Sequence, residues 1–338
     1  MTSTSTGQRP TGQRRADTGP RIGPRRERVP AGPRALARVA QRRTRRRATA
    51  RRVLLSWPLG RAVVLLIALL GAAVLIYPHA QAWFNDRSQA GVVSGYAEQQ
   101  QARTPEQTRA QLDAARAYNA SLPSGPVGDP FATDAGTTRS AELARYDDTL
   151  NLGPNGLMGA LTIPSIGVNL PVYHGTSNTV LDAGIGHLYG TALPVGGPGT
   201  HAVLTGHSGV LGDTLLTDLD KLHDGDTFTI TVLDQALTYQ IDQILTVLPS
   251  QTGALAAVPG QDYVTLVTCT PIGVNSHRLL IRGHRVPTPA SGESAVQALL
   301  DHTGPGFPWW IVIAALVLVA GVAATTPLAR RLPAEVVA

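Results

Sequence analysis

The sequence predicts an all-β domain flanked by two apolar segments, and three observations support this prediction. Short segments that alternate or run apolar follow one another from residue 157 to residue 285, with Gly, Pro, Asn and Asp turns between them. This pattern is typical of a closed or nearly closed antiparallel β-barrel. One apolar run precedes this region and another follows it. The composition, with 43% hydrophobic residues, 35 glycines and 25 prolines, excludes both a wholly disordered chain and a helical bundle.

We place the barrel domain at residues 141–287 and a linker at 288–306. The predicted strands are 158–164, 168–175, 201–207, 227–233, 236–245, 263–269 and 278–284. Between them, the stretches 181–189 and 215–221 are expected to form short helices.

The first 56 residues are rich in arginine and contain few large apolar side chains. From Met1 to Arg61 there are 17 arginines against Asp17 and Glu27, a local charge of +15, so the remainder of this +6 chain carries −9. Such a segment cannot form a core, and we expect a disordered tail over 1–56. Arginine runs also suit nucleic-acid phosphates. The apolar run that follows favours instead a cytoplasmic tail whose partner is membrane lipid, with no nucleic acid bound.

The apolar run over residues 57–77 is predicted to be a transmembrane helix. It approaches the ~20 apolar residues needed to span a bilayer, and its arginine-rich flank marks the cytoplasmic side. A cleaved signal peptide would also combine basic and apolar regions, and the small residues of PHAQA after Tyr77 offer a processing site. Because the run is longer than the usual signal core of about 7 to 15 residues, we favour an uncleaved anchor.

A second apolar run, over residues 307–325, is predicted to be another transmembrane helix. Two tryptophans near its start suit one membrane interface, and two arginines after its end suit the cytoplasmic one. Both tails, 1–56 and 326–338, are then cytoplasmic, and the protein is a two-pass cell-membrane protein. The extracellular segment 78–306 carries 10 basic and 20 acidic residues. A buried hairpin of two core helices is the alternative, and the flanking charges argue against it.

A helical spacer is expected between the first membrane segment and the barrel, over residues 78–121. Within it, Thr104-Pro105-Glu106-Gln107 provides a helix start with proline at the first position. Residues 122–140, which follow, are dense in Gly, Pro, Ser and Thr and are predicted to be a loop.

The only cysteine of the chain lies at the end of a predicted strand. The segment from Tyr263 to Thr268 is rich in β-branched and aromatic residues, so Cys269 falls where this strand ends. A Thr-Pro-Ile-Gly-Val-Asn connection follows, and Leu279 to Ile281 resumes an apolar strand that starts with Arg278. Paired antiparallel, the two strands would bring the thiol and the guanidinium to one end of a sheet. A candidate nucleophile would then lie beside a fixed positive charge.

A cysteine nucleophile needs a cation or base nearby, because the thiolate is the reactive form and an unperturbed thiol has a pKa of about 8.5. Among nine histidines, His207 is the best placed. His201 to Thr205 looks like a buried strand, and Gly206 and Gly209 flank His207 in a turn at its end. We predict that His207 is the base. Five other histidines are expected to be structural or surface groups: His187, His201, His223, His277 and His284.

An extracellular chain with one cysteine cannot form an internal disulfide, so Cys269 is expected to be a free thiol in an oxidising compartment. A buried, inert cysteine is the alternative, and the predicted base and arginine argue against it. Thr217, Asp218 and Asp220 also suggest metal ligands, but their spacing is not that of a calcium loop. We therefore predict neither a metal nor a cofactor.

The motifs around these residues resemble the sortases, cysteine transpeptidases of Gram-positive cell surfaces. The resemblance rests on TLVTC at Cys269, the arginine nine residues later in HRLLIRGHR, and TGH at His207. The flanking sequence GIGHLYGTALPVGGPGTHAVLTGHSG is similar to the class C, pilin-polymerising branch, and the similarity covers roughly Leu157 to Arg285. It implies an eight-stranded sortase barrel and no cofactor. With Lys221 as the only lysine among abundant Arg, Ala and Gly, the composition suggests a GC-rich, actinobacterial genome.

Asp129-Pro130-Phe131, within the predicted loop, resembles the lid of class C sortases, an Asp-Pro-aromatic segment that covers the active site. Carried over by position, Asp129 would face Arg278 and Phe131 would sit over Cys269. A carboxylate can neutralise an unoccupied guanidinium, and an aromatic ring can shield a reactive thiolate. An ordinary turn is the alternative. Substrate would have to displace such a lid.

The resemblance implies acyl transfer from an LPxTG-like sorting signal. Cys269 would attack the Thr–Gly carbonyl, Arg278 would stabilise the oxyanion or position the peptide, and His207 would exchange protons with the two amines. In the pilin branch the acceptor is a pilin lysine, so LPxTG-bearing pilin or surface proteins are the expected partners. Three alternatives stay open: housekeeping-type cell-wall anchoring, a membrane-tethered cysteine peptidase that passes the thioester to water, and a noncatalytic surface-binding protein.

Overall fold

The computed structural model of the protein describes residues 58–123, 128–131, 141–289, 295–301 and 304–325. The tails predicted at 1–56 and 326–338 lie outside the described residues, as do most of the 122–140 loop and part of the 288–306 linker. The chain divides into two compact units, Met1–Val64 and Leu65–Ala338. The features described below belong to the second unit, apart from the first residues of helix α2.

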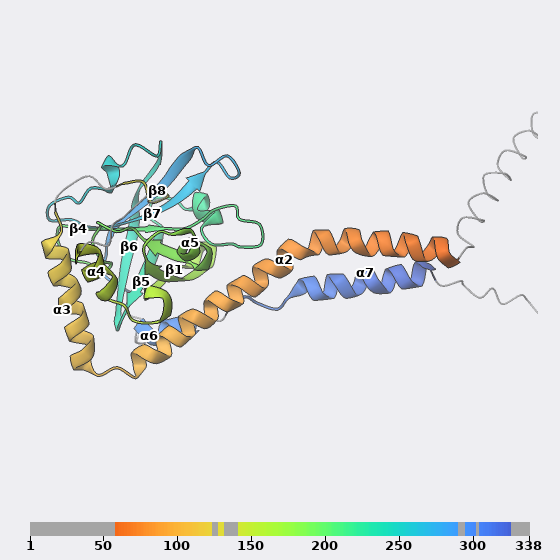
Figure 1. Cartoon of the computed structure of the whole chain (residues 1–338), viewed down its shortest axis with the longest axis horizontal. Helices are drawn as coiled ribbons and strands as arrows, with labels where there is room; N and C mark the ends of the chain where they lie inside the picture. Colours follow the sequence, from red (N-terminus) through yellow and green to blue (C-terminus); the bar gives the residue numbers. More distant parts are fainter. Residues whose placement is uncertain (1–57, 124–127, 132–140, 290–294, 302–303, 326–338) are drawn as a thin grey trace, which may run out of the picture. The chain divides into compact units, whose positions relative to one another are not determined.

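Eight strands form a closed β-barrel in the order β1-β2-β3-β4-β7-β8-β6-β5 (Figure 1). The strands are β1 Leu157–Ile163, β2 Val168–His174, β3 Ile185–His187, β4 Thr200–Thr205, β5 Thr227–Val232, β6 Gln235–Val247, β7 Asp262–Thr270 and β8 His277–Arg285. The seven predicted strands all overlap observed ones, and the expectation of an eight-stranded barrel is confirmed.

The barrel is mixed, which corrects the prediction of a purely antiparallel one. Strand β2 pairs with β3 in parallel, as does β4 with β7, while the other neighbours are antiparallel. The expected helix over 181–189 is also wrong in part. Helix α5, Asn178–Ala183, stops at Gly184, and the chain then enters β3. Three residues are too few for a period-2 pattern, which is why this strand is not among the predicted ones.

The helices lie before, between and after the strands. They are α2 Pro58–Gln101, α3 Pro105–Ser121, α4 Ala141–Asp148, α5, α6 Ala295–Asp301 and α7 Trp309–Thr325, with 3-10 turns η1 Pro154–Gly156, η2 Pro164–Ile166, η3 Thr217–Lys221 and η4 Gly253–Leu255. Helix α3 begins as predicted, because Thr104 and Gln107 form a reciprocal capping box before Pro105. Helix α2 does not end near residue 77 and continues through Pro78. The helix expected over 215–221 is the 3-10 turn η3.

Large apolar side chains fill the barrel and hold β8 in place. The buried rings of Phe228 and Tyr239 stack with centroids 5.6 Å apart. Gly283 of β8 lies against this pair, and a Cβ atom added there would be 2.8 Å from Phe228 Cε1. On the outside of the barrel, the Leu233 amide donates a 2.7 Å hydrogen bond to the buried hydroxyl of Tyr96, which fastens α2 to the barrel. The strand that carries Arg278 is therefore rigidly positioned.

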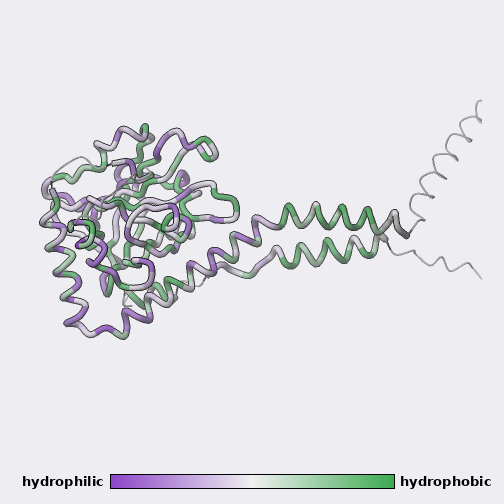
Figure 2. The backbone as a smooth tube through the Cα atoms, viewed as in Figure 1, coloured by the Kyte–Doolittle hydropathy of each residue, from purple (hydrophilic) through white to green (hydrophobic). Residues whose placement is uncertain are grey.

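The first part of α2 and the whole of α7 are apolar (Figure 2). From Ala62 onward, α2 is long and apolar enough to cross a membrane, and its most apolar window is not buried, whereas α7 is a shorter apolar helix. Contacts join the middle of α2 to the start of α7. The Trp83 indole donates a 2.8 Å hydrogen bond to the Gly306 carbonyl, and the ring centroids of Phe84 and Trp310 lie 6.0 Å apart. These features are compatible with membrane anchoring.

Candidate active site

Cys269 and Arg278 lie directly opposite one another on neighbouring strands. Strands β7 and β8 are antiparallel, and their register pairs these two residues one step before the strands diverge into the 271–276 connection. Cys269 is partly exposed and forms no disulfide. The juxtaposition of thiol and guanidinium expected from the sequence is therefore present in the structure.

The segment that carries His207 leaves β4 beside the same end of β7. Its neighbours are tied to β7 on both sides, because Thr268 Oγ1 donates to the Gly206 carbonyl at 2.8 Å and Ser208 Oγ donates to the Cys269 carbonyl at 2.6 Å. The imidazole is 26% exposed, and its Nε2 lies 3.7 Å from Asp182 Oδ1. The site therefore brings a histidine, a cysteine and an arginine to one end of the barrel.

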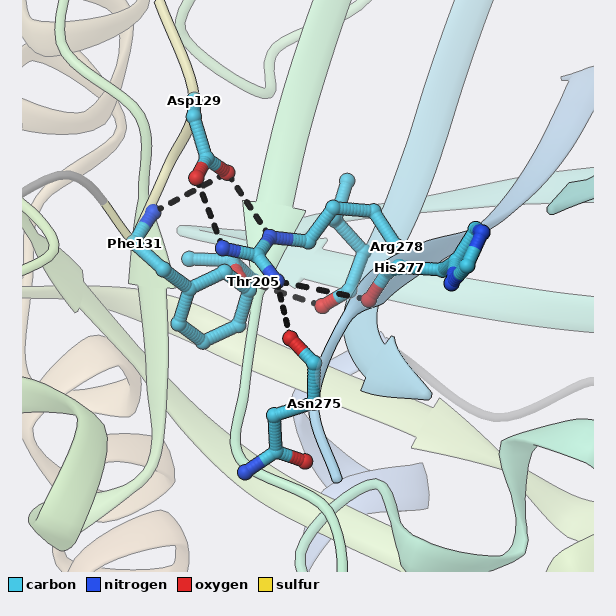
Figure 3. A network of polar contacts seen from close by, with 7 residues as sticks. Asp129, Phe131, Thr205, Asn275, His277 and Arg278 are labelled. Atoms are coloured by element: carbon cyan, nitrogen blue, oxygen red, sulfur yellow. Dashed lines mark hydrogen bonds and ion pairs between the residues drawn. The ribbon is translucent and has the colours of Figure 1, made fainter. Parts of the chain in front are cut away.

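The carboxylate of Asp129 lies against the guanidinium of Arg278 (Figure 3). The Arg278 Nε donates to Asp129 Oδ1 at 2.9 Å and its Nη2 donates to Oδ2 at 2.7 Å, a bidentate ion pair with both side chains at most 15% exposed. The remaining terminal nitrogen, Nη1, donates to the carbonyls of Asn275 and His277 at 3.2 and 3.3 Å. In this conformation, all three guanidinium nitrogens of Arg278 have acceptors.

The ring of Phe131 lies against two candidate catalytic residues, Arg278 and His207. Its centroid is 4.9 Å from the Arg278 Cζ and 6.0 Å from the imidazole centroid of His207. The ring also packs on a small apolar cluster of the barrel: Leu188, Val203, Leu255, Val267 and Leu280. The Asp129-Pro130-Phe131 segment is therefore anchored at both ends, by an ion pair and by apolar contact, with Pro130 buried between them.

The charges around the thiol oppose one another. Partial burial raises the pKa of Cys269, the Arg278 charge lowers it, and the Asp129 charge raises it again. The hydrogen bond to Asp129 also raises the pKa of Arg278 above its ordinary value. With the carboxylate in place, the site favours the unreactive thiol. Loss of the carboxylate would remove one of the two effects that raise the pKa of Cys269, and burial would still raise it.

A cleft of about 190 Å³ opens beside Cys269. Its walls come from Ser208 and Thr217 on one side and from the β7–β8 connection, Pro271 and Ile272, on the other. The side chain of Ile272 is 52% exposed, so an apolar surface borders the thiol. An extended peptide laid along this cleft would bring a carbonyl carbon within reach of the Cys269 thiol.

The structure also shows what the remaining histidines do. Both ring nitrogens of the buried His187 form hydrogen bonds, Nδ1 with the Tyr146 hydroxyl and Nε2 with the Ala192 carbonyl. Burial lowers the pKa of His187 to about 3. The ring of His201 bonds Thr265 and the Ala256 carbonyl. These are structural histidines, as expected. Sequence reasoning missed Asp182 as the neighbour of His207, because a lone aspartate near a helix end carries no signal of such a contact.

Ser208 lies beside the site and has a structural role, because its hydroxyl donates a hydrogen bond to the Cys269 carbonyl. Asp218, considered above as a metal ligand, instead pairs with Lys221 at 2.8 Å. Within the part of the chain that the structure describes, no group of three His, Cys, Asp or Glu side chains is arranged to hold a metal ion.

Comparison with known proteins identifies the family. A sortase domain is matched over residues 161–286. The chain is 45% identical to the crystal structure of sortase C-1 from Actinomyces oris, over 54% of this chain and 100% of that one, with a TM-score of 0.52. It is 44% identical to a lid mutant of sortase A from Corynebacterium diphtheriae, over 56% and 99% of the two chains, with a TM-score of 0.51. For the pilus-related sortase C of Group B Streptococcus, the identity is 39%, the coverage 56% and 94%, and the TM-score 0.50.

The fold and the matched domain define the class: the chain belongs to the sortase family, whose members are cysteine transpeptidases. Two of the three related structures are sortases of class C by name. The chain spans about half the length of the first curated relatives it matches, 47% and 44%, at 31% identity in each case.

Proposed function

We propose that this protein is a membrane-anchored cysteine transpeptidase that cleaves an LPxTG-like sorting signal between Thr and Gly and transfers the acyl group to a lysine amine of a pilin. The observation that supports this most strongly is the grouping of Cys269, His207 and Arg278 beneath Asp129 and Phe131. A barrel that only bound surface proteins would not need a thiol, a base and a cation at one strand end, held under a removable cover.

The first half-reaction forms a thioester. The Cys269 thiolate attacks the threonine carbonyl carbon, and Arg278 donates hydrogen bonds to the oxygen as it becomes negatively charged. The bond from this carbon to the glycine nitrogen then breaks, and His207 donates a proton to the departing amine. A neutral His207 and an acyl-Cys269 thioester remain.

The second half-reaction transfers the acyl group. An unprotonated lysine amine attacks the thioester carbon, the bond to the Cys269 sulfur breaks, and the thiolate leaves. His207 accepts the proton that the amine nitrogen loses, which restores the starting protonation state. The product is an isopeptide bond.

Asp129-Pro130-Phe131 is proposed to be a lid. The bidentate ion pair to Arg278 occupies the nitrogens that the oxyanion would need, and the Phe131 ring lies against the imidazole. The C. diphtheriae structure described as a lid mutant offers a precedent among relatives. Since relatives named for pili share the fold, we favour pilus assembly over wall anchoring.

The apolar first part of α2, up to residue 77, and helix α7 are proposed to be the two membrane anchors, with the barrel outside the cell and both tails in the cytoplasm. The exposed apolar surface of α2 and the pair of tryptophans that begins α7 support this topology. An anchored enzyme would meet sorting signals where they leave the membrane.

The test uses the full chain in detergent micelles with an LPxTG peptide and a lysine-containing acceptor, followed by mass spectrometry of protein and products. We expect an acyl adduct on Cys269 that resolves onto the lysine, and no adduct for Cys269→Ala. His207→Ala should lose product, while His277→Ala, which removes a neighbouring imidazole bonded only to Ser276 among the described contacts, should retain it. Product released only as hydrolysed peptide would favour the peptidase alternative, and no adduct on any variant would remove the catalytic proposal.

A further inference from the structure

A second, larger cavity adjoins the thiol cleft. It has a volume of about 440 Å³ and lies between the α2 residues Asp86, Gln89 and Ala90, the η2–β2 connection, and the segment 209–218 that follows the candidate base. It plays no part in the mechanism above.

The cavity wall is acidic. Asp86, Asp213 and Asp218 contribute to it, and none of the lining residues is Lys, Arg or His. Asp218 is paired with Lys221. Asp86 and Asp213 form no ion pair with any described residue: Asp86 accepts a 2.6 Å hydrogen bond from Thr214 Oγ1, and Asp213 has a long 3.5 Å contact from Gln89 Nε2 and accepts hydrogen bonds from the backbone amides of Thr214 and Leu215. Two carboxylates thus face the cavity without a countercharge from the described chain.

Gln89 supplies a third acceptor at the same place. Its side chain is 94% buried, it lines the cavity, and its Oε1 has no hydrogen-bond partner in the described structure. A buried carbonyl without a hydrogen-bond partner is destabilising, and a bound donor would remove this cost. Two carboxylates and an unpaired amide oxygen form a set of acceptors, and the complementary ligand is a group that carries several N–H donors and a positive charge.

This cavity borders the thiol cleft. Thr217 lines both. The chain crosses between them at consecutive residues, since Ser208 lines the thiol cleft and Gly209 the acidic cavity, and the Gly209 amide donates a 3.0 Å hydrogen bond to Thr217 Oγ1. A cationic side chain in the acidic cavity would therefore be separated from the thiol cleft by Thr217 and the backbone of residues 208–209.

We propose that this cavity is the entry site of the acceptor amine, where Asp86, Asp213 and Gln89 attract the lysine ammonium before it releases one proton to solvent and attacks the thioester on Cys269 as the neutral amine. The inference rests on the proposed transpeptidase function. It adds a location and a charge requirement: the acceptor approaches along α2 and past Thr217, not across the β7–β8 connection.

Electrostatics supports this assignment. Burial raises the pKa of Asp86 and of Asp213, and the neighbouring Asp86 charge raises that of Asp213 further. A bound ammonium would relieve both effects. A cleft lined by one sign of charge also raises the local concentration of an oppositely charged ligand and its association rate.

The experiment compares a cationic with an uncharged nucleophile. The full chain in micelles is acylated with an LPxTG peptide and resolved by Nα-acetyl-lysine amide, which is an ammonium ion at neutral pH, or by hydroxylamine, which is not charged there. The measured quantity is the ratio of transferred to hydrolysed peptide, for wild type, the isosteric double variant Asp86→Asn/Asp213→Asn, and the control Asp224→Asn, an exposed carboxylate outside the cavity.

With the lysine nucleophile, we expect the ratio of transferred to hydrolysed peptide to fall by about three- to tenfold in the double variant, as for loss of a partly buried charge pair. Transfer to hydroxylamine should be retained, and the control variant should give the wild-type ratio. In wild type, added salt should lower the ratio of transferred to hydrolysed peptide for the lysine nucleophile and leave it unchanged for hydroxylamine. An equal fall for both nucleophiles, or no fall for lysine, would overturn the entry site while leaving the transpeptidase proposal intact. A calcium-induced rise in melting temperature that the double variant lacks would assign the cavity to a metal ion instead. If wild type forms no thioester, both proposals fail.

Discussion

Removing the Asp129 carboxylate should expose Cys269 and make it more reactive. The ion pair to Arg278 is bidentate and both side chains are at most 15% exposed, so solvent screens it only partly. Hydrogen bonds to charged groups contribute about 1.5–3 kcal/mol, and we take about 2 kcal/mol as the net loss in Asp129→Ala. That energy corresponds to about a 30-fold increase in the ratio of open to closed lid.

The assay is the second-order rate of Cys269 alkylation by iodoacetamide as a function of pH. Because the Asp129 charge raises the thiol pKa, its removal should shift the midpoint of the rate profile to lower pH and raise the rate at neutral pH by about tenfold or more. Above the thiol pKa, where wild-type cysteine is already thiolate, the remaining difference reports lid opening alone.

A second arginine pair provides the control for this prediction. Arg282, four residues further along β8, forms an equivalent bidentate pair with Asp242, at 2.9 and 3.2 Å. Asp242→Ala should weaken the barrel to a similar degree without touching the thiol. If alkylation rises equally in both variants, the effect is general loosening and the lid argument is refuted; an unchanged rate in Asp129→Ala would refute it as well.

Three further predictions concern the site and the barrel. Arg278→Lys keeps the charge but loses the planar donors, so acyl-enzyme formation, followed by quenched-flow mass spectrometry, should slow by about 10²-fold or more. Tyr146→Phe removes the hydroxyl that receives the Gly175 amide at 2.9 Å, and urea unfolding should show a loss of about 1–3 kcal/mol; a smaller loss would mean that water replaces it. Gly283→Ala forces a Cβ against Phe228, so the same measurement should show a loss of about 1–3 kcal/mol, and none would contradict the close approach.

The sequence was informative wherever a pattern repeats or a residue type is chemically rare. Strands β7 and β8 each contain enough β-branched and apolar residues to be recognised, and their antiparallel pairing follows from the six-residue connection. The pairing of Cys269 with Arg278 follows in turn. The start of α3 was predictable for the same reason, since a threonine, a proline and a glutamine at fixed offsets define a capping box.

What the sequence could not provide depends on contacts between segments far apart in the chain. The parallel pairing of β4 with β7 requires the β5–β6 hairpin to close the barrel on its other side, which no local pattern records. The contact of Asp182 with His207, and the placement of Asp86 and Gln89 beside the 209–218 segment, likewise arise only when α5 and α2 dock on the barrel. Local periodicity reports which face of an element is buried, not which element covers it.

The position of Arg278 implies that the proposed lid acts on substrate affinity and not on the chemical step. Its Nε and Nη2 are occupied by Asp129, and its Nη1 by backbone carbonyls, so an oxyanion can be bound only after the carboxylate leaves. Since only the open fraction binds, a change of about 30-fold in the ratio of open to closed lid alters the apparent affinity for the sorting signal by at most about the same factor. At saturating substrate the lid is already displaced. Asp129→Ala should therefore lower KM with kcat nearly constant, whereas a raised kcat at constant KM would mean that substrate binds first and the lid opens afterwards.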